Sequence, residues 1–238
     1  MPDAKAPLFY CPDLARPEAT RTLSPEETRH AAAQRLRVGE AIALFDGAGH
    51  AADARVQHIG ARSRDLRVDI IERFTLPPPP VPLTLYCALP KGERLATLLD
   101  MATQLGMTRF TPLLCERSVV QPGAGWHTRA QRICIEACKQ SRRWHLPALA
   151  QPATVAAALA GAREQTNRIW FAHPGAGARP SAADIPAAGV AMFIGPEGGF
   201  TESEAALADR GGALRVDLGP RLLRIETAAV ALLAIAGR

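Results

Sequence analysis

Phe193-Ile194-Gly195-Pro196-Glu197-Gly198-Gly199-Phe200-Thr201 and Leu218-Gly219-Pro220-Arg221-Leu222-Leu223-Arg224-Ile225-Glu226-Thr227-Ala228 are the two stretches that decide the fold of this chain. Each contains a glycine-proline turn that follows a short apolar run typical of a buried strand, and each leads into a helical pattern. In open α/β folds, ligands bind where such loops leave the carboxyl edge of a parallel sheet. The two stretches together predict a small-molecule pocket.

The chemistry of the first loop narrows the class of ligand that it can bind. Gly195–Gly199 has neither the Gly-Lys-Ser/Thr ending of a phosphate-binding loop nor the Gly-x-Gly-x-x-Gly pattern of dinucleotide-binding folds. With no lysine and an acidic Glu197, it favours an adenosine-type ligand without phosphate, held by backbone hydrogen bonds. The alternative is a tight turn that binds nothing. A third turn after a strand, Phe171-Ala172-His173-Pro174, favours the pocket, and we expect His173 to contribute its backbone rather than its ring.

Length and composition indicate an ordinary globular protein. The chain has 238 residues, of which 47% are hydrophobic, enough for one large or two small domains. Its first eight residues lack signal-peptide character, and its longest apolar run, 227–236, is too short to span a bilayer. We therefore expect a cytoplasmic protein. Five cysteines without paired spacing predict no disulfide framework, and Cys134 and Cys138 lack the further ligands that a metal site needs.

The proline run 77–80 marks a change of pattern along the chain. Residues 1–75 read as a small β-rich domain, and residues 76–82 as a stiff proline-rich linker. Residues 83–238 alternate strands with helices, which predicts an α/β domain with a mostly parallel sheet. Two capping boxes, Ser24 to Glu27 and Thr201 to Glu204, predict helix starts.

The basic charge is unevenly distributed. The net charge is +5, and the excess lies between residues 74 and 160, where nine basic residues stand against four acidic ones. A helix over 128–143 carries much of it. Such a run is often a solvated face, but here we favour phosphate contact. Basic residues elsewhere extend this set, and the candidate nucleic-acid contacts are Arg16, Arg35, Arg37, Lys91, Arg94, Arg129, Arg132, Lys139, Arg142 and Arg143.

The two C-terminal stretches resemble the signature of the SPOUT methyltransferases. More narrowly, the chain is similar to the ribosomal RNA small subunit methyltransferase E family over nearly its whole length. The segments that agree include His30 with Arg35-Leu36-Arg37, Phe45-Asp46-Gly47, Lys91-Gly92-Glu93-Arg94, Leu105-Gly106, Glu116-Arg117-Ser118 and Glu136-Ala137 with Gln140-Ser141-Arg142. One departure is the strongly basic segment 138–143, which bears on RNA contacts rather than on chemistry.

This resemblance implies a PUA-like β-barrel domain, then an α/β domain with a trefoil knot, in a homodimer. The implied reaction is methylation of N3 of a uridine in 16S ribosomal RNA by S-adenosylmethionine, without a metal. The implied cofactor contacts are Ala172, His173, Pro174, Gly195, Pro196, Glu197, Gly198, Gly199, Leu218, Gly219, Leu222, Leu223 and Thr227. Two alternatives stay open: a SPOUT enzyme acting on a ribose 2′-hydroxyl, and a non-catalytic RNA-binding assembly factor.

Within the implied reaction, the enzyme must deal with the proton on N3 of uracil. Arg224 and Arg221 are the candidates for stabilising negative charge on the uracil oxygens. Glu226 and Glu197 are the candidate bases. The alternative for Glu226 is a structural carboxylate that caps its helix or pairs with Arg224.

Overall fold

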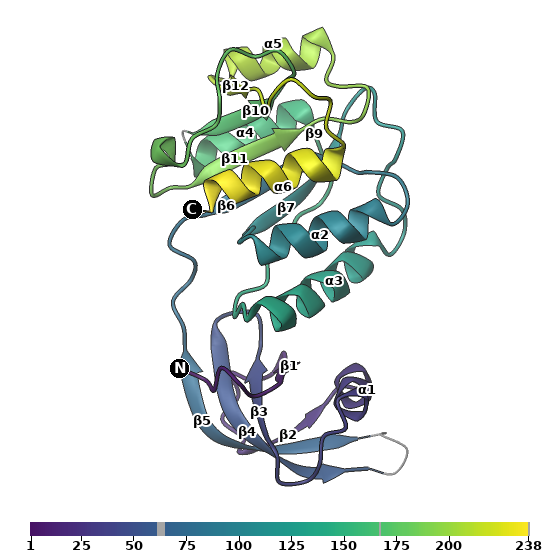
Figure 1. Cartoon of the computed structure of the whole chain (residues 1–238), viewed down its shortest axis with the longest axis vertical. Coiled ribbons are helices and arrows are strands. Elements are labelled where there is room, and N and C mark those ends of the chain that lie inside the picture. Colours follow the sequence, from purple (N-terminus) through teal and green to yellow (C-terminus); the bar gives the residue numbers. More distant parts are fainter. Residues whose placement is uncertain (61–64, 167, 238) are drawn as a thin grey trace. The chain divides into compact units, whose positions relative to one another are not determined.

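A computed structural model describes residues 1–60, 65–166 and 168–237 and divides the chain into two compact units. Unit 1 comprises Met1–Pro78 and Cys138–Leu146, and unit 2 comprises Pro79–Ala137 and Pro147–Arg238 (Figure 1). The division falls inside the proline run. Cys138–Leu146 belongs to unit 1, although it lies within the sequence range that we predicted for the second domain.

Unit 1 is built on a five-stranded sheet in the order β1-β3-β4-β5-β2. Strands β3, β4, β5 and β2 pair antiparallel, and β1 joins β3 in parallel. Its core includes Phe9, Ile42, Leu44 and Leu66. The elements are β1 (Leu8–Tyr10), β2 (Thr20–Leu23), α1 (Pro25–Ala33), β3 (Ala41–Phe45), β4 (His50–Ile59) and β5 (Leu66–Thr75).

The predicted capping box of α1 forms only in part. The Ser24 side chain accepts a hydrogen bond from the backbone N–H of Glu27, as predicted. The Glu27 carboxylate, however, accepts from the backbone N–H of Tyr10 and pairs with Lys139. Tertiary partners thus draw the Glu27 side chain away from its local capping role.

Unit 2 is an α/β structure in which every strand pairing of the described residues is parallel. The sheet order is β12-β10-β11-β6-β7-β8, with β9 pairing with β7. The predicted parallel sheet is therefore confirmed. Its strands are β6 (Leu83–Ala88), β7 (Arg109–Leu114), β8 (Ala148–Leu149), β9 (Ala153–Thr154), β10 (Ile169–Ala172), β11 (Val190–Ile194) and β12 (Leu214–Val216).

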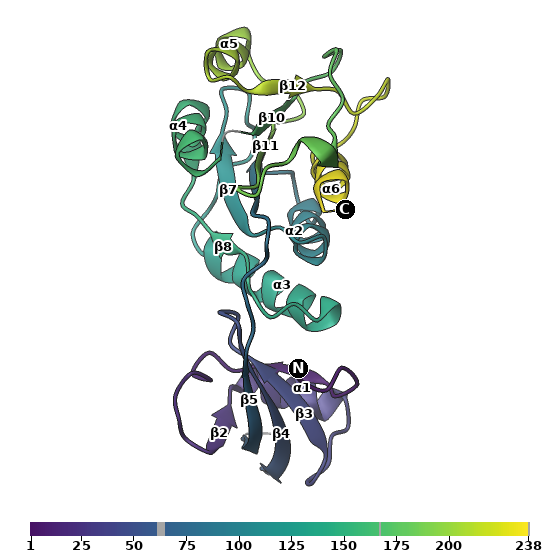
Figure 2. The ribbon, with the colours of Figure 1, turned by 90° about the vertical axis from the view of Figure 1, so that its left-hand side faces the viewer.

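Helices cover both faces of this sheet. Figure 2 shows α4 and α5 on one face and α2 and α6 on the other. The central strands bury Trp170, Phe171 and Phe193 between these layers. The helices are α2 (Arg94–Gln104), α3 (Trp126–Ser141), α4 (Val155–Gln165), the short 3₁₀ turn η2 (Ala182–Asp184), α5 (Glu202–Arg210) and α6 (Ile225–Ala236). The trefoil knot stays a prediction of the resemblance.

The capping box predicted for α5 is complete. The Thr201 side chain accepts from the backbone N–H of Glu204, and the Glu204 carboxylate accepts from the backbone N–H of Thr201. Both donors would otherwise lack a partner at the helix start. Among the described residues, no helix combines the length and apolar character needed to cross a membrane.

Candidate active site

Three predicted loops meet at one edge of the unit 2 sheet. Strands β12, β10 and β11 are parallel neighbours, so their carboxyl ends lie side by side. The loop after β10 begins at His173, whose backbone N–H donates to the carbonyl of Val216 on β12. The loops that start at Gly195 and Asp217 leave the same edge. This is the position at which parallel α/β sheets bind ligands.

The Gly195–Gly199 loop is a tight turn that is crowded at Gly195 and open at Gly199. The backbone N–H of Gly199 donates to the carbonyl of Pro196, and Gly199 has a φ of 69°, in the left-handed region that favours glycine. A Cβ on Gly195 would lie 2.9 Å from the ring of Phe200, itself packed on Phe171. The chain therefore passes here as bare backbone, which suits recognition through amides and carbonyls.

The loop after β12 carries exposed apolar side chains. Gly219 has a φ of 115°, and its N–H donates to the carboxylate of Asp217. Beyond this turn, Leu222 is 90% exposed and Leu223 is 39% exposed. Two exposed leucines after a glycine turn suit a ligand with an apolar or aromatic part.

The two candidate bases lie in different environments. One oxygen of Glu226, Oε2, is buried and has no hydrogen-bond partner among the described residues. Glu197 is instead exposed, and it forms an ion pair of 3.6 Å with Arg94 at the start of α2. A buried acceptor left without a donor is unfavourable, so Glu226 Oε2 is the group at this edge that most needs a ligand.

The candidate arginines are accessible. Arg224 occupies the N-cap position of α6, without a side-chain capping bond, and both Arg224 and Arg221 are exposed. Thr227 is exposed on the first turn of the same helix. The first turn of α6 therefore presents a cation, a carboxylate and a hydroxyl close together in sequence.

Two buried thiols lie near the carboxyl ends of β6 and β7. Burial raises the pKa of the Cys87 thiol well above its ordinary value, and Cys115 and Glu226 raise it further. Burial, with a smaller contribution from Glu204, raises the pKa of Cys115 to about 12. Both side chains are thus neutral thiols at physiological pH. Among the described residues, no His, Cys, Asp and Glu side chains gather as a metal site.

The ten candidate RNA contacts divide between the two units. Arg94 and Arg129 pair with Glu197 and Glu93, and Lys91 and Arg132 are exposed. These four lie in unit 2. The other six lie in unit 1: Arg16, Arg35 and Arg37 are exposed, Arg142 and Arg143 are partly exposed, and Lys139 is buried.

The structure corrects the prediction that Lys139 contacts RNA phosphate. Its ammonium group lies 2.6 Å from a carboxylate oxygen of Glu27, and the two side chains are only 6% and 4% exposed. A lysine so enclosed does not present its charge to RNA. The sequence showed a basic residue on a basic helix, but not the carboxylate that folding brings against it.

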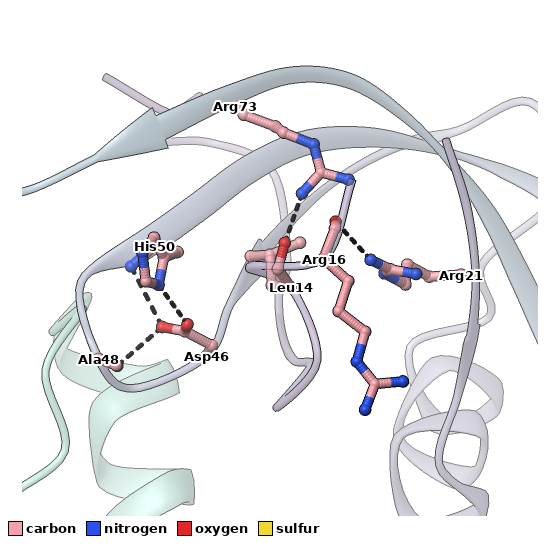
Figure 3. A network of polar contacts seen from close by, with 7 residues as sticks. All are labelled: Leu14, Arg16, Arg21, Asp46, Ala48, His50 and Arg73. Carbon is pink, nitrogen blue, oxygen red and sulfur yellow. Dashed lines mark hydrogen bonds and ion pairs between the residues drawn. The ribbon is translucent and has the colours of Figure 1, made fainter. Parts of the chain in front are cut away.

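The loop that displays Arg16 is held by two other arginines (Figure 3). Arg21 donates to the backbone carbonyl of Arg16 over 2.5 Å and pairs with Glu18. Arg73 donates to the carbonyls of Leu14 and Glu18. The Arg16 side chain itself is 66% exposed. Sequence reasoning assigned no role to Arg21 or Arg73, which act on backbone atoms and leave no local pattern.

A turn beside this loop is also fixed by side chains. The Asp46 carboxylate accepts from the backbone N–H groups of Ala48 and His50 and contacts the His50 ring at 2.6 Å (Figure 3). The carbonyl of Gly47 then accepts from Leu146. The Phe45-Asp46-Gly47 segment noted in the sequence is thus a structural turn of unit 1.

The comparisons agree with this geometry. Residues 77–237 match the family model described as an RNA methyltransferase domain, and residues 23–69 match an RNA methyltransferase PUA domain. Fold and site therefore define the class as an RNA methyltransferase with a PUA-like domain.

The particular family follows from the curated relatives. The chain is 35% identical to ribosomal RNA small subunit methyltransferase E of Synechocystis sp., over 91% of this chain and 72% of that protein. It is 32% identical to the enzyme of the same name from Mycobacterium bovis, over 98% and 91%. The chain belongs to the ribosomal RNA small subunit methyltransferase E family.

Solved structures resemble the whole chain. A putative methyltransferase from Legionella pneumophila in complex with SAM has a TM-score of 0.87 and 30% identity, covering 98% of this chain and 97% of that one. A ribosomal RNA small subunit methyltransferase E from Neisseria gonorrhoeae, bound to S-adenosyl methionine, has a TM-score of 0.82 and 31% identity, covering 96% and 95%.

Proposed function

We propose that this protein methylates N3 of a specific uridine in 16S ribosomal RNA, using S-adenosylmethionine. The single observation that carries the proposal is that the loops starting at His173, Gly195 and Asp217 leave one sheet edge, with Glu226 Oε2 nearby and unpartnered among the described residues. Two similar structures are described as bound to this cofactor.

The residues at this edge fit such a donor. Bare backbone at Gly195–Gly199 and the exposed Leu222 and Leu223 would hold its adenosine part, and the loops offer no lysine for a phosphate. When bound, the donor supplies an already activated methyl group. The remaining tasks of the protein are to position the uracil and to manage the proton on N3.

We assign the acceptance of that proton to Glu226 and not to Glu197. The buried, unpartnered Oε2 of Glu226 is able to accept a proton, whereas the Glu197 carboxylate is engaged by Arg94. We expect Glu226→Gln to lower the rate of methyl transfer about a hundredfold, as for loss of a general base, and Glu197→Gln to lower it about threefold at most. Single-turnover methylation of 16S RNA checks this, and equal losses in the two variants would remove the assignment.

Two experiments test the overall proposal against its alternatives. Calorimetry with S-adenosylmethionine separates an enzyme from a non-catalytic RNA-binding factor, for which no donor binding is expected. Mass mapping of 16S rRNA nucleosides from a strain lacking the protein then fixes the position. Loss of 3-methyluridine supports the proposal, while loss of a 2′-O-methyl nucleoside establishes the other SPOUT reaction.

We also propose a homodimer, because α6 is apolar beyond the face that unit 2 covers. Ala229, Leu232 and Leu233 are buried, while Val230, Ala231 and Ala234 remain partly exposed. A helix that is apolar on all sides needs a further partner. Sedimentation at equilibrium tests this, and a monomer at micromolar concentration would contradict it.

We propose that unit 1 contributes RNA contacts through Arg35. This residue lies just after the C-cap of α1 and has a φ of 57°, a conformation that residues other than glycine rarely adopt. The backbone N–H of Leu36 donates to Ala31 and that of Arg35 to Ala32, which is the helix ending where glycine is preferred. Gly106 fills the equivalent place after α2.

A strained arginine in place of glycine predicts opposite effects on binding and stability. We expect Arg35→Gly to relieve strain, leaving the free energy of unfolding unchanged or raised by up to about 1 kcal/mol, despite loss of a favourable cation at the helix end. The same change should weaken RNA binding and lower the slope of log affinity against log salt by about one. Arg35→Asn, which also tolerates this backbone, serves as control. Reduced stability with unchanged RNA affinity would make Arg35 purely structural.

A further inference from the structure

The Gly195–Gly199 loop is braced by the segment that follows β7. Arg117 donates from Nη1 to the backbone carbonyl of Gly198 at 2.9 Å and to that of Phe200 at 3.4 Å. Its aliphatic stem also lies over Gly198, because a Cβ placed there would stand 3.5 Å from the Arg117 Cβ and Cδ. One side chain thus holds the Gly198 carbonyl of the loop and the Phe200 carbonyl just after it, and its stem lies against Gly198.

Two peptide groups, one in the loop and one just after it, are hydrogen-bonded at both ends. In the peptide between Gly198 and Gly199, the carbonyl accepts a hydrogen bond from Arg117 and the N–H donates one to the carbonyl of Pro196. In the peptide between Phe200 and Thr201, the carbonyl accepts a hydrogen bond from Arg117. Its N–H donates to Oε2 of Glu204 at 2.8 Å. A peptide bonded at both its C=O and its N–H cannot rotate without breaking a hydrogen bond.

A buried carboxylate closes these contacts into a ring. Glu204 is 5% exposed, and its second oxygen, Oε1, accepts from the backbone N–H of Glu116, next to Arg117 in the chain. The Ser203 hydroxyl adds a bond to the Glu116 side chain. The ring therefore runs from Arg117 through the loop carbonyls, Thr201 and Glu204 back to Glu116, and it fixes the loop against the end of β7.

From this ring we propose that Arg117 is a positioning residue for the methyl donor, which presets the backbone of the Gly195–Gly199 loop and depends on Glu204 as its buried anchor. The inference rests on the proposed function, since it takes this loop as part of the donor site. A preset loop avoids the ordering cost of binding, so losing the brace weakens donor affinity. Arg117 donates to backbone carbonyls of this segment, so it acts as a positioning residue and not as a catalytic residue.

The chain offers a matched control for this proposal. Arg163 also donates to two backbone carbonyls, those of Gly211 and Arg210, each over 2.8 Å, at the far end of α5. We expect Arg117→Met to raise the Kd for S-adenosylmethionine about tenfold, while Arg163→Met changes it less than twofold. Arg117→Lys keeps the charge, but its side chain is one atom shorter than the one that places Nη1 against both carbonyls, so its Kd should fall between those of wild type and Arg117→Met.

Calorimetry on the full chain, together with hydrogen exchange of the Gly199 and Thr201 amides, tests whether Arg117 positions the loop. Faster exchange at these amides with a raised Kd in the Arg117 variants supports the brace. An unchanged Kd in Arg117→Met, or equal changes in Arg117→Met and Arg163→Met, overturns it. Should Arg117→Met not fold, a wild-type Kd in Arg117→Lys overturns it equally. Failure of the wild type to bind the donor would instead reject the proposed function itself.

Discussion

Arg224→Ala should lower the rate of methyl transfer about a thousandfold while changing the Kd of the donor less than threefold. Arg224 stands exposed at the N-cap of α6, two residues before Glu226. Removing the N3 proton places negative charge on the uracil oxygens, and a guanidinium beside them stabilises that charge. The complex of the protein with the donor alone contains no charged uracil. Arg224→Ala should therefore lower turnover and leave donor binding nearly unchanged.

Arg215 supplies the control for this variant. It lies in the same unit, and its guanidinium forms a bidentate pair with Asp209, at 2.8 and 2.6 Å. Arg215→Ala should keep turnover within about threefold of wild type, as for a partly exposed structural pair. Single-turnover methylation with saturating donor measures both variants. Near-normal turnover in Arg224→Ala would remove Arg224 from the mechanism.

The second large effect concerns stability. Lys139→Met should destabilise unit 1 by about 3–5 kcal/mol, because it withdraws the cation from a buried ion pair and leaves the Glu27 carboxylate without that ammonium. Urea denaturation, monitored through hydrogen exchange of unit 1 amides, measures the loss in the free energy of unfolding. A double change, Lys139→Met with Glu27→Gln, should recover part of it by removing the buried charge.

The matched comparison is Arg129→Met on the same helix. Arg129 pairs with Glu93, but these side chains are 62% and 86% exposed. A pair so accessible contributes about 0–1 kcal/mol. Similar losses in Lys139→Met and Arg129→Met would show that burial does not strengthen the Lys139 contact, and would return Lys139 to the candidates for RNA binding.

Local patterns predicted the fold well where local bonds decide it. The strand-loop-helix stretches around Gly195 and Gly219 lie on a parallel sheet, as expected, because short buried strands and glycine turns are specified by neighbouring residues. Likewise, Thr201 and Glu204 form a full capping box. Ser24 and Glu27 have the same spacing but form half of one, since Glu27 finds Tyr10 and Lys139.

The parts of the site that the sequence did not reveal depend on distant partners. Arg117 lies in the Glu116-Arg117-Ser118 segment that agrees with the family, but its bonds to backbone carbonyls far along the chain have no sequence signature. Glu226 and Glu197 were both candidate bases, and the burial of Glu226 Oε2 and the Arg94 pair of Glu197 distinguish them only in the structure. The basic helix likewise placed Lys139 among the candidate phosphate contacts, because composition reports charge and not enclosure.

The protonation of the two buried thiols at the sheet edge bears on a methyl donor bound there. A sulfonium alkylates thiolates readily, and Cys87 and Cys115 both lie near the carboxyl ends of their strands. Because burial keeps the pKa of Cys87 well above its ordinary value and that of Cys115 at about 12, neither offers a thiolate at physiological pH. A methyl donor bound at this edge, as we propose, would therefore lie near neutral thiols and not near thiolates.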